Sequence, residues 1–351
     1  MMDRRPIWAM PAWVPVEIGD ALPADWELVV IDEATDGSGD GAARVSPGVL
    51  EAVGGAEVYF GYGIPAELLD AGAALRWVHS GAAGVGSSLT PTMRASPVVF
   101  TNSAGIHGPP MAEAVLAMIL FFCRGLDIAI AGQRRAQWSN QKYYVAGAPL
   151  SELSSSTIGI VGFGGVGREV ARRVASLGAQ VIAVKRTPPR PGEADLAPVA
   201  GGGTLGSRIE LVQGGPGLDR VLRESDAIVV TAPDTAATRG LIDAAAIERM
   251  KRGAVLINVA RGRLVDEVAL VAALRDGRIR GAGLDVFSEE PLPPDHSLWS
   301  LPNVVVTPHV SAVTGMFWRR ETDLILRNLE RYLTRVPTGC WENVVDKEAG
   351  Y

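Results

Sequence analysis

The sequence predicts an α/β protein built from two doubly wound domains. Two blocks of the chain alternate short apolar stretches with amphipathic ones, a pattern typical of mainly parallel sheets covered by helices. The chain has 351 residues, about twice the length of a typical domain. Apolar residues make up 47% of it and charged residues 21%, which provides enough apolar material for two cores.

Net charge and cysteine content narrow the classes of partner. The net charge of −6 argues against a generic binder of nucleic acid or anionic membranes. The two cysteines, Cys123 and Cys340, are too few for a disulfide framework or a zinc cluster, so we expect a reducing compartment and no metal. The longest apolar run, residues 114–123, is too short to span a bilayer and indicates a buried helix. We therefore expect a cytoplasmic protein that binds neither nucleic acid nor membranes.

The first block contains alternating strand and helix candidates. Its apolar stretches predict four strands: Trp26–Asp32, Ala56–Gly63, Leu75–Gly81 and Pro97–Asn102. Between them, residues 46–53 and 65–72 predict short helices that start at a serine or a proline. A longer helix is expected over residues 111–126, which Pro109 and Pro110 precede.

The second block predicts a dinucleotide-binding sheet. Six stretches predict strands: Thr157–Gly164, Gln180–Arg186, Asp226–Pro233, Ala254–Ala260, Gly281–Val286 and Asn303–His309. Helix candidates between them include residues 168–178, 244–250 and 267–277, so the order fits a Rossmann fold. The glycine-rich residues 191–217 predict a long loop or a small hairpin. Residues 317–335 predict an amphipathic helix that crosses back to the first domain.

A glycine pattern follows the first strand of this block, Gly162-x-Gly164-x-x-Gly167. The first glycine permits a tight turn, the second lets the backbone approach a pyrophosphate, and the third permits close packing of helix and sheet. The N–H groups at the start of the following helix would face the phosphates. We therefore expect this loop, with Gly165 and Val166, to bind a dinucleotide. The alternative is a tight strand–helix turn with no ligand.

The end of the next strand favours NADP over NAD. An NAD site places Asp or Glu about 20 residues after the glycines, where it accepts from the ribose 2′-hydroxyl. No carboxylate lies between Val181 and Arg190, and the turn instead carries Lys185, Arg186, Thr187 and Arg190. Cations and a hydroxyl suit a 2′-phosphate, and we expect Arg186 to make the main contact, with Arg190 second. The alternative is a solvated basic turn.

Polar residues at three strand ends form the candidate catalytic site. Arg261, Glu290 and His309 each follow a different strand of the second block, so they can converge at one rim of the sheet. The arginine can bind a carboxylate with both arms of its fork. A glutamate next to a histidine stabilises the imidazolium, which suits proton transfer near neutrality. Each residue alone would more often be a surface charge or a helix cap.

The other three histidines are expected to have different roles. His79 and His107 border glycine-rich turns, and His296 lies in a proline-rich loop. We expect structural roles for the first two and a surface position for the third.

In these motifs the sequence resembles the D-isomer-specific 2-hydroxyacid dehydrogenases. The resemblance covers nearly the whole chain and rests on the stretches TNSAGIHGPPMAEAVLAMIL, TIGIVGFGGVGREVA, TAPDTAATRGLI, MKRGAVLINVARGRLVDEVAL, GAGLDVFSEEPLPPDHSLW and NVVVTPHVSA. It implies hydride transfer between a nicotinamide and C2 of a small 2-oxo or 2-hydroxy acid. The basic turn resembles that of the NADPH-preferring glyoxylate and hydroxypyruvate reductases, so NADP is the expected cofactor, with NAD as the alternative.

The resemblance implies roles for individual residues by matching positions. Arg261 holds the substrate carboxylate and carbonyl oxygen, His309 exchanges the hydroxyl proton, and Glu290 pairs with His309. The loop Ser80–Ser88 cradles the carboxylate with its backbone N–H groups. The implied substrate contacts are Ala83, Gly84, Val85, Arg261 and His309. Further cofactor contacts are implied at Ala232, Pro233, Val259, Ala260, Asp285 and His309.

The resemblance also implies the architecture and the assembly. A Rossmann dinucleotide-binding domain, residues 109–310, is inserted into a flavodoxin-like substrate domain made of residues 1–108 and 311–351. Members of the family dimerise around residues 111–150, and Trp138 resembles a tryptophan that reaches toward the partner's cleft. We therefore expect a homodimer.

Two alternatives remain open at this point. A dinucleotide-sensing regulator or corepressor of the same fold could retain the same three residues, and turnover of 2-oxo acids separates it from an enzyme. A phosphite-type dehydrogenase is not distinguished by the sequence, whereas formate-type relatives carry an amide where Glu290 stands.

Overall fold

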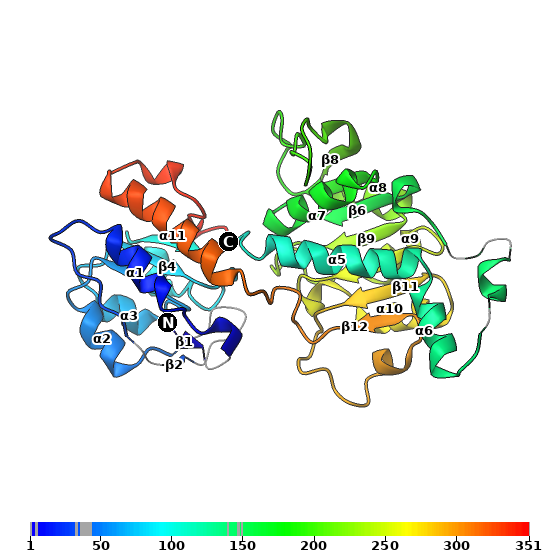
Figure 1. Ribbon diagram of the computed structural model, residues 1–351, viewed down its shortest axis with the longest axis horizontal. Helices are drawn as coiled ribbons and strands as arrows, with labels where there is room; N and C mark the ends of the chain where they lie inside the picture. The colour runs from blue at the N-terminus through cyan, green and yellow to red at the C-terminus, as the bar shows by residue number, and fades with distance from the viewer. Residues whose placement is uncertain are drawn as a thin grey trace. The chain divides into compact units, whose positions relative to one another are not determined.

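The chain divides into two compact α/β units (Figure 1). The first joins Met1–His107 to Val313–Tyr351, and the second is Gly108–Ala312. The computed structural model describes residues 2–3, 6–31, 34–35, 44–138, 140–145, 148 and 150–350. Both units are built on parallel sheets, as the sequence predicts.

The second unit contains a parallel sheet of seven strands in the order β12-β11-β10-β9-β6-β7-β8. Their bounds are Thr157–Val161 (β6), Gln180–Lys185 (β7), Ile209–Gln213 (β8), Ala227–Val230 (β9), Val255–Asn258 (β10), Gly281–Leu284 (β11) and Val304–Val306 (β12). β6 lies between β7 and β9, so the chain leaves β6 toward one side and later returns to the other. This is the switch point at which open α/β sheets bind their ligands, outside the carboxyl ends of the strands.

One strand of this sheet was not predicted. Residues 191–217 were expected to be a loop or hairpin, but they contain β8, which pairs in parallel with β7. The helix α8 (Gly214–Glu224) follows directly. In β8 only Ile209 is fully buried, because β8 is the edge strand. Its sequence therefore lacks a long apolar run. The glycines at the start of α8 are typical of loops, so the local pattern predicts a loop there.

Helices cover both faces of this sheet. The helices α5 (Gly108–Cys123) and α7 (Gly165–Ser176) contribute to one core, whereas α8, α9 (Ala244–Arg249) and α10 (Glu267–Arg275) contribute to the other. The strand β9 shows the alternation: Ile228 and Val230 belong to one core, Ala227 and Val229 to the other.

The helix expected over residues 111–126 starts earlier and is interrupted. α5 ends at Cys123, and Gly125, in the left-handed region at φ +63°, separates it from α6 (Leu126–Arg134). Within the described residues no single helix is long and apolar enough to cross a membrane. α5 and α6 reach that length and composition only together, and they are bent by 72° at the break.

The first unit contains a three-stranded parallel sheet, β3-β4-β5, and a separate parallel pair of short strands. The three strands are Val58–Gly61 (β3), Trp77–Ser80 (β4) and Val99–Asn102 (β5), and the pair is Met2–Asp3 (β1) and Ala34–Thr35 (β2). The helices are α1 (Trp13–Asp20), α2 (Pro47–Val53), α3 (Ala66–Ala71), α4 (Pro91–Ala95) and α11 (Phe317–Leu333). α11 comes from the C-terminal segment, and its Phe317 and Ile325 share a core with Val14 and Trp77. Short 3-10 helices complete the two units: Pro6–Trp8, Gln141–Tyr143, Leu153–Ser155, Gly206–Arg208, Gly262–Leu264, Ser297–Ser300 and Thr338–Cys340.

The strand predicted over Trp26–Asp32 is wrong. Residues 26–31 form no strand, and Asp32 lies outside the described residues. Val29 and Val30 are 57% and 45% exposed, whereas Leu28 packs against a core of the first unit. The β-branched residues favour a strand locally, but without burial or a paired neighbour that preference is not sufficient.

Candidate active site

The turn between β6 and α7 has the shape that the glycine pattern predicts. Gly162 lies in the left-handed region at φ +104°, where a side chain would be strained, and a Cβ there would lie 2.8 Å from the Ala232 nitrogen. A Cβ on Gly167 would overlap the carbonyl oxygen of Gly162. The Thr231 hydroxyl donates to that same carbonyl at 2.8 Å. The turn is therefore fixed on one side by the chain that follows β9.

The start of α7 leaves room for an anion. Gly164 is the N-cap and has no side chain to satisfy the first N–H groups of the helix. A Cβ on Gly164 would meet no atom within 4 Å, so its absence is not required by packing. These are the properties of a cradle for the pyrophosphate of a dinucleotide, and the residues present fit that group.

The turn after β7 separates the predicted cations into two groups. Arg186, Thr187 and Arg190 are exposed, whereas the ammonium of Lys185 lies 2.6 Å from both carboxylate oxygens of Glu193. Lys185 therefore has a protein partner, Glu193. Glu193 lies three residues after Arg190, beyond the turn that has no carboxylate of its own, and no local pattern predicts that the chain folds back to place it there.

A buried asparagine shapes the turn that carries Arg261. Asn258, at the end of β10, accepts from the N–H of Ala260 at 3.0 Å and donates to the carbonyl of Arg261 at 2.9 Å. The Arg261 guanidinium donates to the carbonyl of Ala260 at 2.7 Å. A Cβ on Gly262 would overlap the backbone of Phe287, so the turns after β10 and β11 are in direct contact. The expected cofactor contacts Ala232, Pro233, Val259 and Ala260 follow β9 and β10 at the same edge of the sheet.

The carboxylate of Asp285 anchors the segment that carries His309. Asp285 is fully buried after β11 and accepts from the Thr307 hydroxyl at 2.5 Å and from the N–H groups of Val310 and Ser311 at 2.9 and 3.0 Å. The N–H of His309 donates to the Asp285 carbonyl at 2.9 Å. These bonds hold His309 in the left-handed region at φ +54°, a conformation that costs about 1–2 kcal/mol for a residue with a side chain.

His309 and Glu290 form a hydrogen-bonded pair. His309 Nδ1 lies 2.7 Å from Glu290 Oε2, and the other carboxylate oxygen accepts from the N–H of Phe287 at 2.9 Å. An ionised carboxylate only accepts, so Nδ1 carries the proton and Nε2 is the nitrogen left for a substrate. Among the described residues Nε2 has no hydrogen-bond partner. The strands β10, β11 and β12 are neighbours in the sheet, so Arg261, Glu290 and His309 follow three adjacent strands at one edge.

The remaining histidines have structural contacts. His296 caps the Ser297–Ser300 helix by accepting from the Leu298 N–H at 3.3 Å, and it is half-buried. The ring of His107 is stacked on Phe317, with centroids 5.5 Å apart. His79 is buried in the first unit and is described below.

The loop after β4 presents backbone N–H groups. The carbonyl of Ala83 accepts from the Asn102 side chain at 2.8 Å, and the carbonyl of Ala82 accepts from the Ser103 N–H at 3.4 Å. By contrast, the N–H groups of Ala83, Gly84 and Val85 donate to no other residue in the described part of the chain. Three consecutive N–H groups without a partner among the described residues suit a carboxylate, the ligand that the family resemblance implies for this loop.

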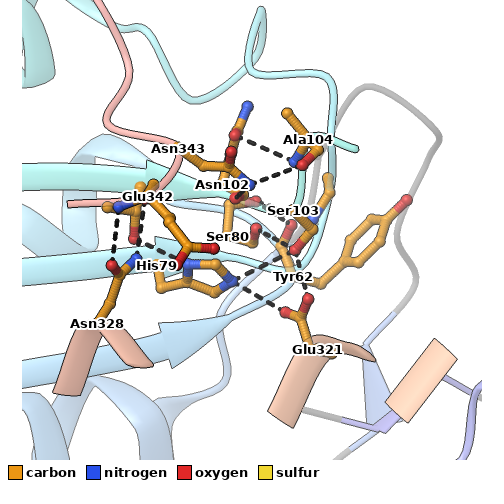
Figure 2. Close-up of polar contacts among 12 residues, drawn as sticks. Tyr62, His79, Ser80, Asn102, Ser103, Ala104, Glu321, Asn328, Glu342 and Asn343 are labelled. Atoms are coloured by element: carbon orange, nitrogen blue, oxygen red, sulfur yellow. Dashed lines mark hydrogen bonds and ion pairs between the residues drawn. The ribbon is translucent and has the colours of Figure 1, made fainter. Parts of the chain in front are cut away.

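A buried polar cluster lies beneath this loop (Figure 2). His79 Nε2 is 3.0 Å from Glu321 Oε1, and the Ser103 hydroxyl donates to Glu321 Oε2 at 2.7 Å. The Ser103 hydroxyl also lies 3.0 Å from the carbonyl of Ser80, where the loop begins. Serine and glutamate face the same ring nitrogen, so this set is not a nucleophile–base–acid relay. Instead the cluster connects α11 to β4 and β5.

Comparison with known proteins identifies the class. Residues 116–311 match the family model for the NAD-binding domain of D-isomer-specific 2-hydroxyacid dehydrogenases. The chain is 33% identical over 268 residues to a glyoxylate reductase of Thermofilum pendens, covering 76% of this chain and 74% of that protein. It is 34% identical over 238 residues to a glycerate dehydrogenase of Methylorubrum extorquens, covering 67% of each.

Solved structures agree with this result. A D-isomer-specific 2-hydroxyacid dehydrogenase of Xanthobacter autotrophicus Py2, in complex with NADPH and MES, matches with a TM-score of 0.73 and 28% identity over 96% of this chain and 95% of that one. An NADPH-dependent glyoxylate/hydroxypyruvate reductase of Sinorhizobium meliloti, in complex with NADP and sulfate, matches with a TM-score of 0.68 and 29% identity over 85% and 87%.

The fold and the site thus define an oxidoreductase that uses a nicotinamide dinucleotide. The chain belongs to the D-isomer-specific 2-hydroxyacid dehydrogenase family, which confirms the resemblance seen in the sequence. Its cofactor is NAD(P), and its reaction is hydride transfer at a 2-hydroxy or 2-oxo acid. Among the described residues no group of three or more His, Cys, Asp or Glu side chains is placed to hold a metal ion.

Removal of the Glu321 carboxylate should destabilise the first unit. Glu321→Ala removes the buried carboxylate that His79 and Ser103 share, so we expect a loss of about 3 kcal/mol in the free energy of unfolding. Asp323→Ala on the same helix is the control, because Asp323 is 46% exposed in its pair with Arg319 and should cost less than about 1 kcal/mol. Urea unfolding measures both. Equal losses in the two variants would contradict a structural role for the cluster.

Alanine substitutions at two glycines of the phosphate loop should have different effects on stability and on cofactor binding. Gly167→Ala places a Cβ against the Gly162 carbonyl and should cost about 1–3 kcal/mol of stability. Gly164→Ala meets no protein atom and should change stability by less than about 0.5 kcal/mol. It should nevertheless weaken dinucleotide binding about tenfold or more, because the Cβ occupies the approach of the pyrophosphate. Thermal unfolding and a fluorescence titration with NADPH measure the two effects; unchanged NADPH affinity in Gly164→Ala would place the phosphates elsewhere.

Proposed function

We propose that this protein reduces small 2-oxo acids of the glyoxylate and hydroxypyruvate type to D-2-hydroxy acids, with NADPH as the preferred cofactor. The observation that carries the proposal is the His309–Glu290 pair, 2.7 Å apart, at the edge of the sheet that also bears Arg261. An acid–base histidine with an anionic neighbour and an arginine fork are the groups that reduction of a 2-oxo acid requires.

Each residue has one role in the proposed mechanism. Arg261 binds the substrate carboxylate and polarises the carbonyl oxygen at C2. When bound, the reduced nicotinamide supplies the hydride to C2. His309, as imidazolium, donates its Nε2 proton to the carbonyl oxygen, and Glu290 holds the ring through Nδ1 and stabilises its positive charge. In the reverse direction neutral His309 takes the proton from the hydroxyl.

The two structural units have separate roles in this proposal. The first unit is the substrate domain, and its N–H groups at Ala83, Gly84 and Val85 receive the carboxylate. The second unit is the dinucleotide domain. The bounds expected from the sequence, 109–310 within 1–108 and 311–351, serve as the proposed domain limits. Asp285 supports the cofactor side of the site by holding the His309 segment.

The exposed residues of the turn after β7 support NADPH. Arg186, Thr187 and Arg190 are exposed beyond the end of the strand, where the 2′-phosphate of a dinucleotide lies in this fold. Two structural relatives contain NADPH or NADP. Arg186 makes the main contact in our proposal, and Lys185 acts through Glu193 instead of touching the phosphate.

We further propose a cytoplasmic homodimer whose partners are small molecules and not nucleic acid or membranes. α6 buries none of its apolar side chains fully, and Leu126, Ile130 and Trp138 are exposed, Trp138 fully. Exposed apolar residues gathered in one segment favour a protein interface. Cys123 and Cys340 are both free thiols, which suits a reducing compartment.

The function is tested by a substrate panel. Glyoxylate, hydroxypyruvate, pyruvate and bulkier 2-oxo acids are offered with NADPH and with NADH, and the loss of reduced cofactor is measured. We expect the highest kcat/KM with the two smallest polar acids and NADPH. Binding of NADPH without turnover of any acid would favour a regulator, and oxidation of phosphite with NADP would favour the phosphite-type alternative.

The proposed roles of His309 and Glu290 predict how the rate of their variants depends on pH. His309→Asn should lower kcat by orders of magnitude while NADPH affinity changes little. Glu290→Gln should move the alkaline limb of the kcat/KM profile for reduction to lower pH, because the imidazolium loses its anionic neighbour. Initial rates across pH measure both effects. Full activity of His309→Asn, or an unmoved profile in Glu290→Gln, would remove that residue from the mechanism.

The proposed preference for NADPH over NADH predicts the effect of removing Arg186. Charge-assisted hydrogen bonds contribute roughly 1.5–3 kcal/mol each, so one or two should favour NADPH by about tens- to thousands-fold in kcat/KM. Arg186→Ala should remove most of this preference, whereas Arg208→Ala, which removes an exposed cation bonded to the Gly178 carbonyl, should not. Comparable efficiencies with NADPH and NADH in the parent enzyme would contradict the proposal, as would a full preference in Arg186→Ala.

A further inference from the structure

The turn after β7 is closed by one buried carboxylate. We propose that Glu193 is a positioning residue: it holds the turn of residues 186–190 in the shape in which Arg186 and Arg190 meet the 2′-phosphate of NADPH. The inference rests on the proposed NADPH preference and names the residue that maintains it.

Four hydrogen bonds converge on the side chain of Glu193. Lys185, the last residue of β7, donates to both carboxylate oxygens at 2.6 Å. Arg168 donates to Oε1 at 2.5 Å, and the backbone N–H of Arg190 donates to Oε2 at 2.9 Å. The carboxylate therefore joins the end of the strand to the far end of the turn.

Arg168 extends this connection to the phosphate loop. It lies in the first turn of α7, and its guanidinium lies over the ring of Phe163, 4.8 Å from the centroid. Phe163 is the residue between the first two glycines of the loop and is 5% exposed. Glu193 thus fixes the turn after β7 relative to the loop that cradles the pyrophosphate. The 2′-phosphate and the pyrophosphate belong to one ligand, so their two sites must keep a fixed separation.

Glu193 is not placed as the ribose acceptor of an NAD site. Such a carboxylate must offer an oxygen to the 2′-hydroxyl, and it would repel a 2′-phosphate. The side chain of Glu193 is 4% exposed, and both of its oxygens already accept from cations or from the backbone. Its charge is balanced by Lys185 and Arg168, so the site retains a net positive charge for an anion.

Glu193 also does not occupy the place of the 2′-phosphate, so a bound phosphate would not displace it. Lys185 is 12% exposed in its pair with Glu193, so the ion pair lies beneath the turn and not on its surface. Burial raises the pKa of the Glu193 carboxyl, but the hydrogen bonds from Lys185 and the Arg190 N–H outweigh it, and the pKa lies below its usual value. An ionised and fully bonded group of this kind is a permanent part of the turn.

The test uses two fragments of the cofactor, adenosine 2′,5′-bisphosphate and 5′-AMP, with affinities measured by calorimetry. In Glu193→Gln the ratio of the two affinities should fall about tenfold or more through weaker binding of the bisphosphate, whereas 5′-AMP binds nearly as before. The KM for NADPH should rise while kcat stays close to that of the parent. Glu193→Asp, which keeps the charge, should retain part of the preference.

Matched controls separate positioning from direct contact. Glu210→Gln removes an exposed carboxylate from the neighbouring strand β8, where it pairs with Arg220, and should leave the ratio unchanged. Lys185→Met should also lower the ratio, and Lys185→Met with Glu193→Gln should be no worse than Glu193→Gln alone. Additive losses would mean that Lys185 touches the phosphate itself. Lys185→Met keeps the proposal testable if Glu193→Gln does not fold, because it leaves Glu193 paired with Arg168.

The outcomes distinguish this inference from the proposed function. If Arg186→Ala lowers the ratio and Glu193→Gln does not, NADPH preference stands and the positioning role is overturned. If Glu193→Gln strengthens binding of the bisphosphate, Glu193 occupies the place of the 2′-phosphate in the free protein. If it weakens binding of 5′-AMP alone, Glu193 is an acceptor for the ribose. If neither variant changes the ratio, both the preference and the positioning role fail.

Discussion

The buried carboxylate of Asp285 holds in place the segment that carries His309, the proposed acid–base residue. It accepts three hydrogen bonds from residues 307–311, and its own carbonyl accepts from the His309 N–H. Hydrogen bonds to a charged group contribute about 1.5–3 kcal/mol each, which offsets the cost of the left-handed backbone at His309. In that conformation the imidazole meets Glu290. The contact between His309 and Glu290 therefore depends on Asp285, which has no part in the proposed proton transfer.

Buried carboxylates that accept several hydrogen bonds join chain segments in both units. Glu193 joins the turn after β7 to the phosphate loop, and Glu321 joins α11 to the strands beneath the loop after β4. An ionised carboxylate has two oxygens and about four acceptor sites, so one side chain can fix a whole loop. Loops at the carboxyl edge of a parallel sheet must be irregular to bind ligands, and buried acceptors make them rigid.

The sequence predicts the parts of the site that follow from strand order. Arg261, Glu290 and His309 lie three to six residues after the ends of apolar strands, and parallel strands bring their carboxyl ends to one edge. The positions of Glu193 and Glu321 depend on chain segments that fold back, and a pattern within one segment does not contain that information. The sequence does not predict β8, because an edge strand buries little. The strand predicted over residues 26–31 is wrong because β-branched residues favour a strand locally even where, as at Val29 and Val30, they are exposed.

The most direct measurement follows the hydride itself. The enzyme is given glyoxylate or hydroxypyruvate with NADPH that carries deuterium at the transferable position of C4, in ordinary water, and the product is analysed by mass spectrometry and chiral chromatography. The expected product carries one deuterium at C2 and, for hydroxypyruvate, has the D configuration only. A product whose C2 hydrogen comes from solvent, or one of L configuration, would contradict the proposed reaction.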